Sequence, residues 1–255
     1  MKGCFKLPVN IPISNPYTTS IMDINFLNKS KQDLLNHHIY PILHNKVKSF
    51  IVTANPEIVM RAREDQAYKE AITRADYIIP DGAGIIVASR LLKTPIIERV
   101  PGFDLMNDLI AYAEIHSLSC YMLGAKEEVN SKMIGKLKEK HPNLTIAGNH
   151  HGYFDMDDRF IVNSVKNAQA DLVFVALGFP RQENWITKHY HEFDKGLFMG
   201  VGGCFDVLAG EVKRAPDSWI KLNLEWLYRL LKQPFRWKRI LKAIEFIIRI
   251  QLKRY

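Results

Sequence analysis

Short apolar runs alternate with segments of helical periodicity through most of the chain. The runs occupy residues 47–53, 77–80, 119–123, 144–147, 172–177 and 197–201. Between them, apolar residues recur every three or four positions over residues 56–73, 84–92, 103–116, 127–141, 157–167 and 182–190. Strands that alternate with helices are typical of crossover units in a parallel sheet. We therefore expect an α/β fold: a Rossmann-like, mostly parallel sheet with helices on both faces.

The two ends of the chain break this alternation. Residues 8–22, which are rich in proline, predict a hairpin or an extended arm. From Ser218 onward no strand pattern remains, and two helices are expected. Pro234 fits the first turn of the second helix, because a proline there has no N–H to lose. We expect a Rossmann-like domain over residues 1–210 and a basic helical appendage over residues 211–255.

The net charge is concentrated in this appendage. The whole chain carries 35 Lys and Arg against 27 Asp and Glu, a net charge of +8. Residues 211–255 hold twelve of the basic and four of the acidic residues, so residues 1–210 are balanced, with 23 of each. A basic segment on a neutral domain is typical of a protein that meets an anionic partner.

After Pro234 the appendage predicts a basic amphipathic helix. The apolar side of its helical wheel holds Trp237, Ile240, Leu241, Ile244, Ile247 and Ile248, and the opposite side holds Lys238, Lys242, Arg249 and Lys253. Such a helix suits the surface of an anionic bilayer. With Trp219 and Trp226 nearby, we favour membrane contact over a terminal helix packed on the domain with a solvated basic face.

The remaining composition indicates the compartment. Cys4, Cys120 and Cys204 are scattered and odd in number, which favours reduced thiols. The N-terminus lacks the apolar region of a signal peptide, and no apolar stretch approaches the ~20 residues that span a bilayer. We expect a cytoplasmic protein that is peripheral on the inner face of the cell membrane.

Asp81 is the most informative candidate for chemistry. It ends the apolar run 77–80, and Gly82 and Gly84 open the helical pattern that follows. In a parallel sheet, ligands bind in the crevice at the carboxyl ends of the strands. The glycines let backbone approach a ligand, and a helix start offers N–H groups to an anion. A carboxylate there repels phosphate but can take a proton from a neighbouring hydroxyl. The pattern predicts base catalysis beside a phosphorylated substrate, with an N-cap role for Asp81 as the alternative.

Three other strand ends carry candidate substrate-binding residues. Thr53 faces the crevice, and Asn55 is interpreted as an N-cap that stands beside it. Gln182 can donate and accept hydrogen bonds, which suits a sugar hydroxyl or acetamido group, or it is solvated in a first helical turn. Gly200 and Gly202 follow another strand and either cradle a diphosphate or nucleoside or form a tight turn.

Two further motifs bear on phosphate and metal binding. Arg99 precedes a turn into a helix and either pairs with a phosphate or stays solvated. Asp155 and Asp157 have the spacing of a divalent-metal motif, but they directly precede a helical pattern. We therefore favour capping by Asp157 or Asp158. The histidines and cysteines lack zinc-ligand spacing, and we expect no metal and no cofactor.

These motifs, in this order, resemble those of the WecG/TagA/CpsF family of bacterial glycosyltransferases, glycosyltransferase family 26. The resemblance extends from about residue 47 to residue 239. It is carried by Thr53-Ala54-Asn55-Pro56-Glu57, Pro80-Asp81-Gly82-Ala83-Gly84, Arg99-Val100-Pro101-Gly102, Gly178-Phe179-Pro180-Arg181-Gln182-Glu183, Gly200-Val201-Gly202, Arg214-Ala215-Pro216, Glu225-Trp226, Arg229, Pro234 and Arg236. The wall teichoic acid branch is most similar. In that branch, N-acetylmannosamine passes from its UDP donor to undecaprenyl-diphosphate-linked N-acetylglucosamine.

The resemblance implies an inverting transfer that forms a β-1,4 bond without a metal. Asp81 would be the general base on the 4-hydroxyl of the acceptor. Thr53 and Gln182 would hold substrate, and Arg99 would contact a phosphate. The appendage residues that would bind the lipid diphosphate are Arg229, Arg236 and Arg239.

Other functions remain open at this point. A nicotinamide-dependent oxidoreductase would use the glycine-rich strand ends, although the spaced dinucleotide fingerprint is missing. A non-enzymatic module would bind nucleic acid or another polyanion through the appendage. A member of the same family would use another donor, such as UDP-N-acetylmannosaminuronic acid or a glucosyl nucleotide. We favour the mannosaminyl transfer, with a UDP-sugar donor, a lipid-linked acceptor and an anionic membrane surface as partners, no nucleic acid, and homo-oligomer formation left open.

Overall fold

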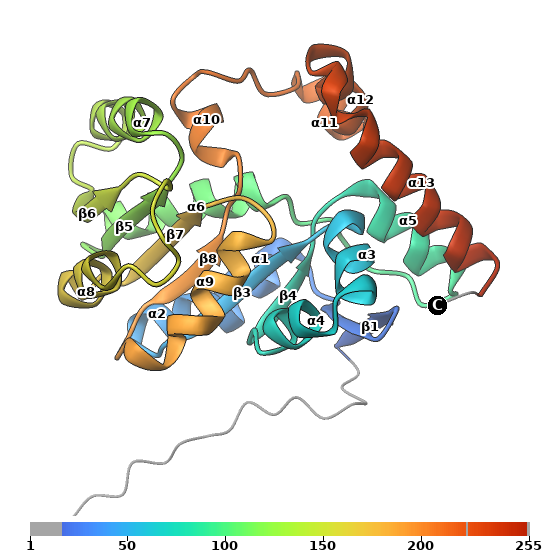
Figure 1. Ribbon diagram of the computed structural model, residues 1–255, viewed down its shortest axis with the longest axis horizontal. Helices are drawn as coiled ribbons and strands as arrows, with labels where there is room; N and C mark the ends of the chain where they lie inside the picture. The colour runs from blue at the N-terminus through green and yellow to red at the C-terminus, as the bar shows by residue number, and fades with distance from the viewer. Residues whose placement is uncertain (1–16, 223, 254–255) are drawn as a thin grey trace, which may run out of the picture.

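A six-stranded parallel sheet forms the centre of the molecule in the computed structural model, which describes residues 17–222 and 224–253 (Figure 1). In chain order its strands are β3 (Ser49–Ala54), β4 (Tyr77–Pro80), β5 (Ser119–Gly124), β6 (Thr145–His150), β7 (Leu172–Ala176) and β8 (Leu197–Gly200). Their order across the sheet is β4-β3-β8-β7-β5-β6, and every neighbouring pair is parallel. The expected α/β fold with a Rossmann-like sheet is confirmed.

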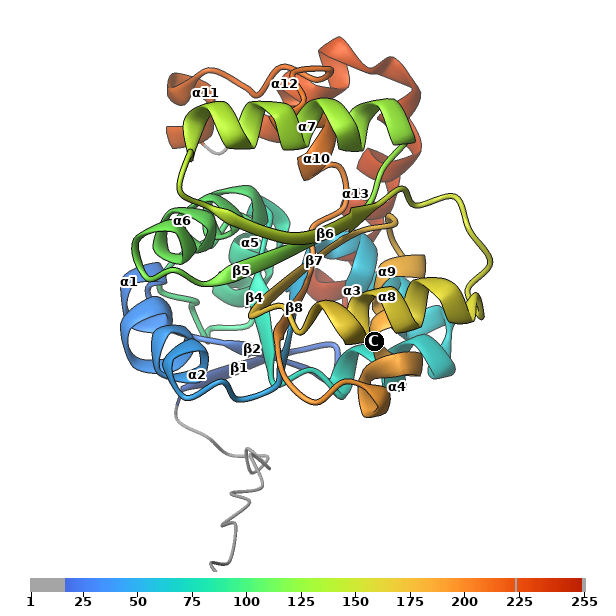
Figure 2. The same cartoon turned by 90° about the vertical axis from the view of Figure 1, so that its left-hand side faces the viewer.

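Helices cover both faces of this sheet (Figures 1 and 2). On one face lie α3 (Pro56–Glu64), α4 (Gln66–Thr73), α5 (Ala83–Leu91), α8 (Arg159–Ala168) and α9 (Arg181–His189), which is followed by the 3₁₀ turn η2 (Tyr190–Glu192). On the other lie α1 (Lys31–Leu34), the π-helical turn η1 (Leu35–Ile39), α2 (Tyr40–His44), α6 (Gly102–Ile115), α7 (Glu127–Lys140) and α10 (Cys204–Leu208). Alternate strand residues enter two cores: in β7, Val173 and Val175 pack into the first core and Phe174 into the second. Strands buried on both faces read as continuous apolar runs, which is why the sequence reveals them.

The helix expected over residues 56–73 is wrong, because α3 and α4 are separate helices. Asp65 lies between them in an extended conformation, with φ −135° and ψ 102°, and its side chain accepts a hydrogen bond from the Tyr68 N–H at 3.1 Å. The Asp65 cap therefore ends one helix and starts another, although the apolar residues recur without a break. The helical residues 31–44 were not predicted, since Pro41 and two adjacent histidines interrupt their pattern.

A two-stranded hairpin precedes the sheet. It consists of β1 (Thr18–Ile21) and β2 (Ile24–Leu27), and Met22 and Asp23 form its turn with φ of 50° and 61°. Two central residues with positive φ are the hairpin turn whose twist matches that of the strands. Of the expected hairpin or arm over residues 8–22, residues 8–16 lie outside the described residues.

The appendage is helical and packs on the domain. It contains α11 (Asp217–Lys221), α12 (Glu225–Lys232), the 3₁₀ turn η3 (Pro234–Arg236) and α13 (Trp237–Gln251), so there is one short helix more than expected. Pro234 opens η3, as expected for a first-turn proline. α13 lies along α3 and α5 (Figure 1) and buries Phe246 and Ile250 in the first core. Over residues 17–222 and 224–253, every helix is too short or too polar to cross a membrane.

Candidate active site

Asp81 lies at the carboxyl edge of the sheet, immediately after β4. Its N–H donates to the carbonyl of Ala54 in β3 at 2.9 Å. The N-cap of α5 is Gly82, whose φ of +104° favours glycine, and no side chain caps this helix. The alternative of Asp81 as an N-cap is therefore wrong. Its carboxyl instead accepts a hydrogen bond from the Gly102 N–H, at the start of α6, at 3.3 Å.

The surroundings of Asp81 make it a stronger base than an ordinary aspartate. Burial raises the pKa of this carboxyl, while Arg99 and the Gly102 N–H oppose that rise. Glu225 raises the pKa further and Arg229 lowers it. A carboxylate with a raised pKa accepts a proton from a hydroxyl more readily.

Thr53, Gly102 and Gly200 form the floor beside Asp81. The Thr53 hydroxyl donates to the Gly200 carbonyl at 3.4 Å, which links the ends of β3 and β8. A Cβ at Gly102 would lie 3.0 Å from Thr53 Oγ1, so the start of α6 rests directly on that hydroxyl. The ends of β3, β4 and β8 thus meet at one place, as expected for a parallel sheet.

Asn55, Gly82 and Gly84 bring two helix starts together. Asn55 Oδ1 accepts a hydrogen bond from the Ile58 N–H at 3.1 Å, which confirms its capping role. A Cβ at Gly82 would lie 3.5 Å from Asn55 Cβ, and one at Gly84 would lie 2.6 Å from Pro56 Cγ. The glycines therefore allow the start of α5 to pack closely on the start of α3.

Gln182 lies under the loops that follow β7 and β8 and is only 5% exposed. Its Oε1 accepts a hydrogen bond from the Gly202 N–H at 2.9 Å, and its Nε2 donates to Glu183 Oε1 at 2.7 Å. A Cβ at Gly200 would lie 2.7 Å from Gln182 Nε2. Gln182 Oε1 therefore links the start of α9 to the loop after β8, while Gln182 Nε2 bonds within its own helix turn. Direct contact with substrate stays a prediction.

Glu183 was not assigned to the site from the sequence, where it suggests a solvated helix start. It is 1% exposed. Burial raises its pKa to about 7, against the hydrogen bond from Gln182 that lowers it. Only the fold shows that this helix start faces inward.

We expect Glu183→Gln to change how stability depends on pH. The folded-state pKa of about 7 exceeds the ordinary 4.5, so the wild type loses stability as the pH rises from about 4.5 to about 7. In that window the unfolded chain ionises while the folded protein keeps its proton. The Tm difference between Glu183→Gln and wild type should rise through this window and then level off. The exposed Glu128→Gln should show no such change. If Tm depended on pH in the same way in Glu183→Gln and in wild type, the prediction would be contradicted.

Arg99 is joined to the appendage by a buried ion-pair network. Arg99 Nη2 lies 3.0 Å from Glu225 Oε2, and Arg229 Nη2 lies 2.5 Å from Glu225 Oε1. The side chains of Arg99 and Glu225 are 10% and 12% exposed. An arginine of the domain and one of α12 therefore meet at a single carboxylate near Asp81. The motif Glu225-Trp226 was visible in the sequence, but its partner was not.

The appendage arginines Arg229, Arg236 and Arg239 gather at the same edge of the sheet. Burial, together with the neighbouring charges of Arg239 and Arg229, lowers the pKa of Arg236 to about 10. Arg239 Nε lies 3.6 Å from Glu57 Oε1, in the first turn of α3. Cations that crowd one another are stabilised by a bound anion.

Cys204 and Arg214 complete the surroundings. Arg214 belongs to the motif Arg214-Ala215-Pro216, whereas nothing in the sequence singles out Cys204. Arg214 pairs with Asp104 of α6 at 2.5 Å and lies over the Phe103 ring, 4.7 Å from its centroid. Burial, with a contribution from Asp81, raises the pKa of the Cys204 thiol to about 12. This cysteine is therefore a neutral thiol and a poor nucleophile.

The Asp155–Asp157 motif lies in the turn directly before α8. Asp158 is the N-cap, and its carboxyl accepts a hydrogen bond from the Phe160 N–H at 2.9 Å. Asp157 pairs with Lys188, and Asp155 accepts a hydrogen bond from the Asp157 N–H at 2.8 Å. Capping by Asp158 is confirmed.

Comparison with known proteins adds to this geometry. The profile of the glycosyl transferase WecG/TagA/CpsF family matches residues 19–255. The chain is 41% identical over 235 residues to the N-acetylglucosaminyldiphosphoundecaprenol N-acetyl-beta-D-mannosaminyltransferase of Staphylococcus aureus strain MW2, with 91% of each chain covered. The enzyme of the same name from strain NCTC 8325 is also 41% identical over the same coverage, and that from strain MRSA252 is 40% identical.

Proposed function

Since the chain belongs to the WecG/TagA/CpsF family and is a glycosyltransferase, we propose that it transfers N-acetylmannosamine from UDP-N-acetylmannosamine to lipid-linked N-acetylglucosamine. The acceptor sugar is carried on undecaprenyl diphosphate, and its 4-hydroxyl forms a β-1,4 bond with inversion. This transfer is an early step of wall teichoic acid synthesis. The names of the Staphylococcus aureus relatives support the acceptor and the transferred sugar. Family membership excludes the oxidoreductase and the non-enzymatic polyanion-binding module.

The observation that carries the mechanism is the Asp81 carboxyl at the edge where β3, β4 and β8 end. In the proposed single displacement, the acceptor oxygen attacks the anomeric carbon, and its proton moves to Asp81. The bond from that carbon to the diphosphate breaks on the opposite face, and UDP leaves. The raised pKa of Asp81 supports its role as the general base.

Positive groups around Asp81 support binding of two diphosphates, one in the UDP donor and one in the lipid acceptor. Arg99 and the N–H groups of the nearby helix starts would stabilise charge on the departing UDP. The crowded Arg229, Arg236 and Arg239 would bind the diphosphate of the lipid acceptor, which relieves their mutual repulsion. Thr53, Gln182, Gly200 and Gly202 would line the sugar and nucleotide positions.

The direct test is release of UDP from UDP-N-acetylmannosamine, with and without a lipid-diphosphate-linked N-acetylglucosamine. Release that depends on the acceptor establishes both donor and reaction. Release only from UDP-N-acetylmannosaminuronic acid or from a glucosyl nucleotide would replace the donor and keep the reaction class. Failure with every nucleotide sugar would contradict the proposed function.

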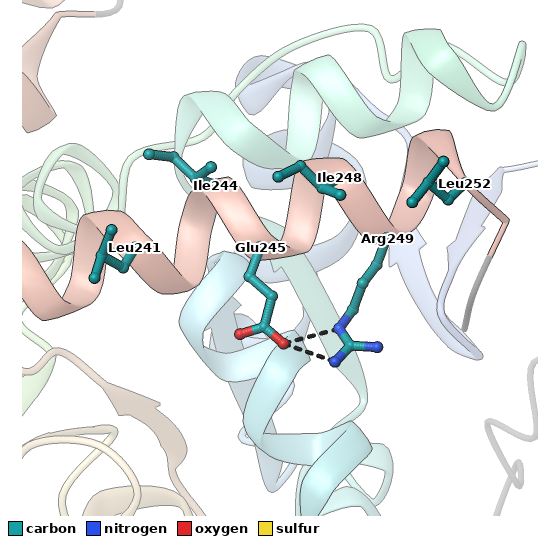
Figure 3. Close-up of a pocket in the computed structure, with 6 residues that line it drawn as sticks. All are labelled: Leu241, Ile244, Glu245, Ile248, Arg249 and Leu252. Atoms are coloured by element: carbon teal, nitrogen blue, oxygen red, sulfur yellow. Dashed lines mark hydrogen bonds and ion pairs between the residues drawn. The ribbon is translucent and has the colours of Figure 1, made fainter.

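The appendage presents an apolar surface that supports membrane contact. Leu241, Ile244, Ile248 and Leu252, here called the outer apolar face, recur along one side of α13 (Figure 3) and are between 49% and 55% exposed. Ile247 does not belong to this face, because it packs against the first core.

The appendage exposes further aromatic and basic side chains besides the outer apolar face. Trp226 and Trp237 are also exposed, and Lys238 neighbours Trp237 on the same helix. An exposed apolar strip with basic neighbours marks contact with an anionic bilayer. We therefore place the enzyme peripherally on the inner face of the cell membrane.

We expect the triple variant Leu241→Ser/Ile244→Ser/Ile248→Ser to bind anionic vesicles at least about tenfold more weakly, because it loses most of its apolar contact area. These point substitutions keep Phe246 and Ile250, which a truncation would remove from the core. A matched control is Ile115→Ser/Phe160→Ser, which changes side chains that are 76% and 70% exposed on α6 and α8. Equal sedimentation of all three proteins with vesicles would contradict the assignment of this face.

A further inference from the structure

One carboxylate connects the domain and the appendage next to Asp81. Glu225, in the first turn of α12, pairs with Arg99 from the segment before α6 and with Arg229 one turn further along its own helix. Because Arg99 and Glu225 are nearly enclosed, removal of one partner leaves a buried charge unpaired. Breaking this contact therefore costs more free energy than breaking a solvated surface ion pair.

This network also determines what the Asp81 carboxyl contacts. Among the described residues, the ion pairs of Arg99 and Arg229 go to Glu225, and Asp81 accepts the Gly102 N–H. A guanidinium paired directly with a carboxylate would lower the pKa of that carboxylate and make it a weaker base. Within the part of the chain that the structure describes, the titratable groups that face this network include Cys204 of α10, Arg214 of the segment before α11, which pairs with Asp104 of α6, and Arg236 of η3.

We propose that Glu225 is a positioning residue that holds Arg99 and Arg229 beside Asp81 and keeps both guanidinium groups from pairing with that carboxylate. The proposal rests on the proposed function, in which Asp81 is the base. It deepens that function, because the same contact that docks α12 on the domain then completes the surroundings of the base. An enzyme with an undocked appendage would retain Asp81 but lose this arrangement.

The charge of Glu225 and the length of its side chain have separable effects. Its negative charge raises the pKa of Asp81, whereas Arg99 and Arg229 lower it. Without that charge, both arginines lose their shared partner and act on Asp81 unopposed. A shorter side chain that keeps the charge can pair with only one of the two arginines.

The test is the pH dependence of kcat/KM for the lipid-linked acceptor in Glu225→Gln. The acidic limb reports ionisation of the base, and we expect it to move to lower pH by about one unit, with a plateau about tenfold lower. Glu225→Asp keeps the charge, so its limb should stay near that of the wild type while the acceptor KM rises. The matched control is Glu64→Gln, which removes an exposed ion pair between α3 and Lys242 of α13 and should leave the profile unchanged.

A second background guards against misfolding of Glu225→Gln, which leaves Arg99 unpaired. In Arg99→Gln/Glu225→Gln the acidic limb of the pH profile should lie at lower pH than in Arg99→Gln alone, because the two variants differ only in the carboxylate of Glu225. An unmoved limb in both backgrounds, with only a raised KM or a lowered Tm, would overturn the inference. A wild type that releases no UDP in response to acceptor would overturn the proposed function and the inference together, whereas an active wild type with an unmoved limb overturns the inference alone.

Discussion

Asp81→Asn should lower turnover by roughly 10²–10⁴-fold, because the acceptor hydroxyl loses the group that takes its proton. The amide preserves the size of the side chain and can still accept the hydrogen bond from the Gly102 N–H. We therefore expect KM values near those of the wild type and a fall confined to kcat. The measurement is acceptor-dependent UDP release, with the exposed Asp194→Asn as the control. Turnover within a few-fold of wild type would contradict the assignment of the base.

The same substitution should stabilise the protein at neutral pH. Burial raises the folded-state pKa of Asp81 above its unfolded value. The ionised carboxylate therefore destabilises the native state once the pH exceeds the pKa of an ordinary aspartate. An uncharged amide removes this cost. We expect the Tm of Asp81→Asn to exceed that of wild type at pH 7 and the two values to converge at acidic pH. A lower Tm at pH 7 would show that the carboxylate is structural.

Arg229→Gln/Arg236→Gln should lower kcat/KM for the lipid-linked acceptor by roughly 10²–10⁴-fold, since each of the two charged hydrogen bonds contributes about 1.5–3 kcal/mol. The loss should appear mainly in the KM of the acceptor, because these residues are proposed to bind its diphosphate. Arg249→Gln is the matched control, since Arg249 lies on α13 and pairs with Glu245 at 2.8 Å.

An acceptor without the diphosphate separates this role from a general effect on the fold. Wild type and the double variant should use such an acceptor with similar, low efficiency. An equal loss with both acceptors would contradict direct binding of the diphosphate by Arg229 and Arg236.

The sheet and its catalytic edge could be predicted from the sequence because both follow from local patterns. Tyr77–Pro80 has the predicted bounds, and the other sheet strands differ by a few residues at their ends. Buried strands are continuous apolar runs, and their carboxyl ends must share an edge when the sheet is parallel. Thr53, Asp81 and Gly200 were therefore grouped correctly at one edge, although their contacts with substrate stay predictions.

The contacts that complete the site could not be predicted, because they depend on tertiary placement. Glu225 is an ordinary first-turn acid of α12 until the fold brings Arg99 to it, 126 positions away in sequence. Glu183 suggests a solvated position until α9 turns its first residues inward. The break at Asp65 is different: a side-chain cap was available locally, and the apolar period concealed it.

The place of β8 within the sheet affects the order in which the chain can fold during synthesis. The first strand of the sheet, β3, pairs on one side with β4 and on the other with β8, the last strand to leave the ribosome. Until residue 200 has emerged, β3 exposes a free hydrogen-bonding edge, and the two halves of the sheet remain unjoined. Nascent chains that stall before this point would be prone to pair with one another. Translation that is slowed before residue 200 has emerged should therefore lead to aggregated fragments in place of soluble intermediates.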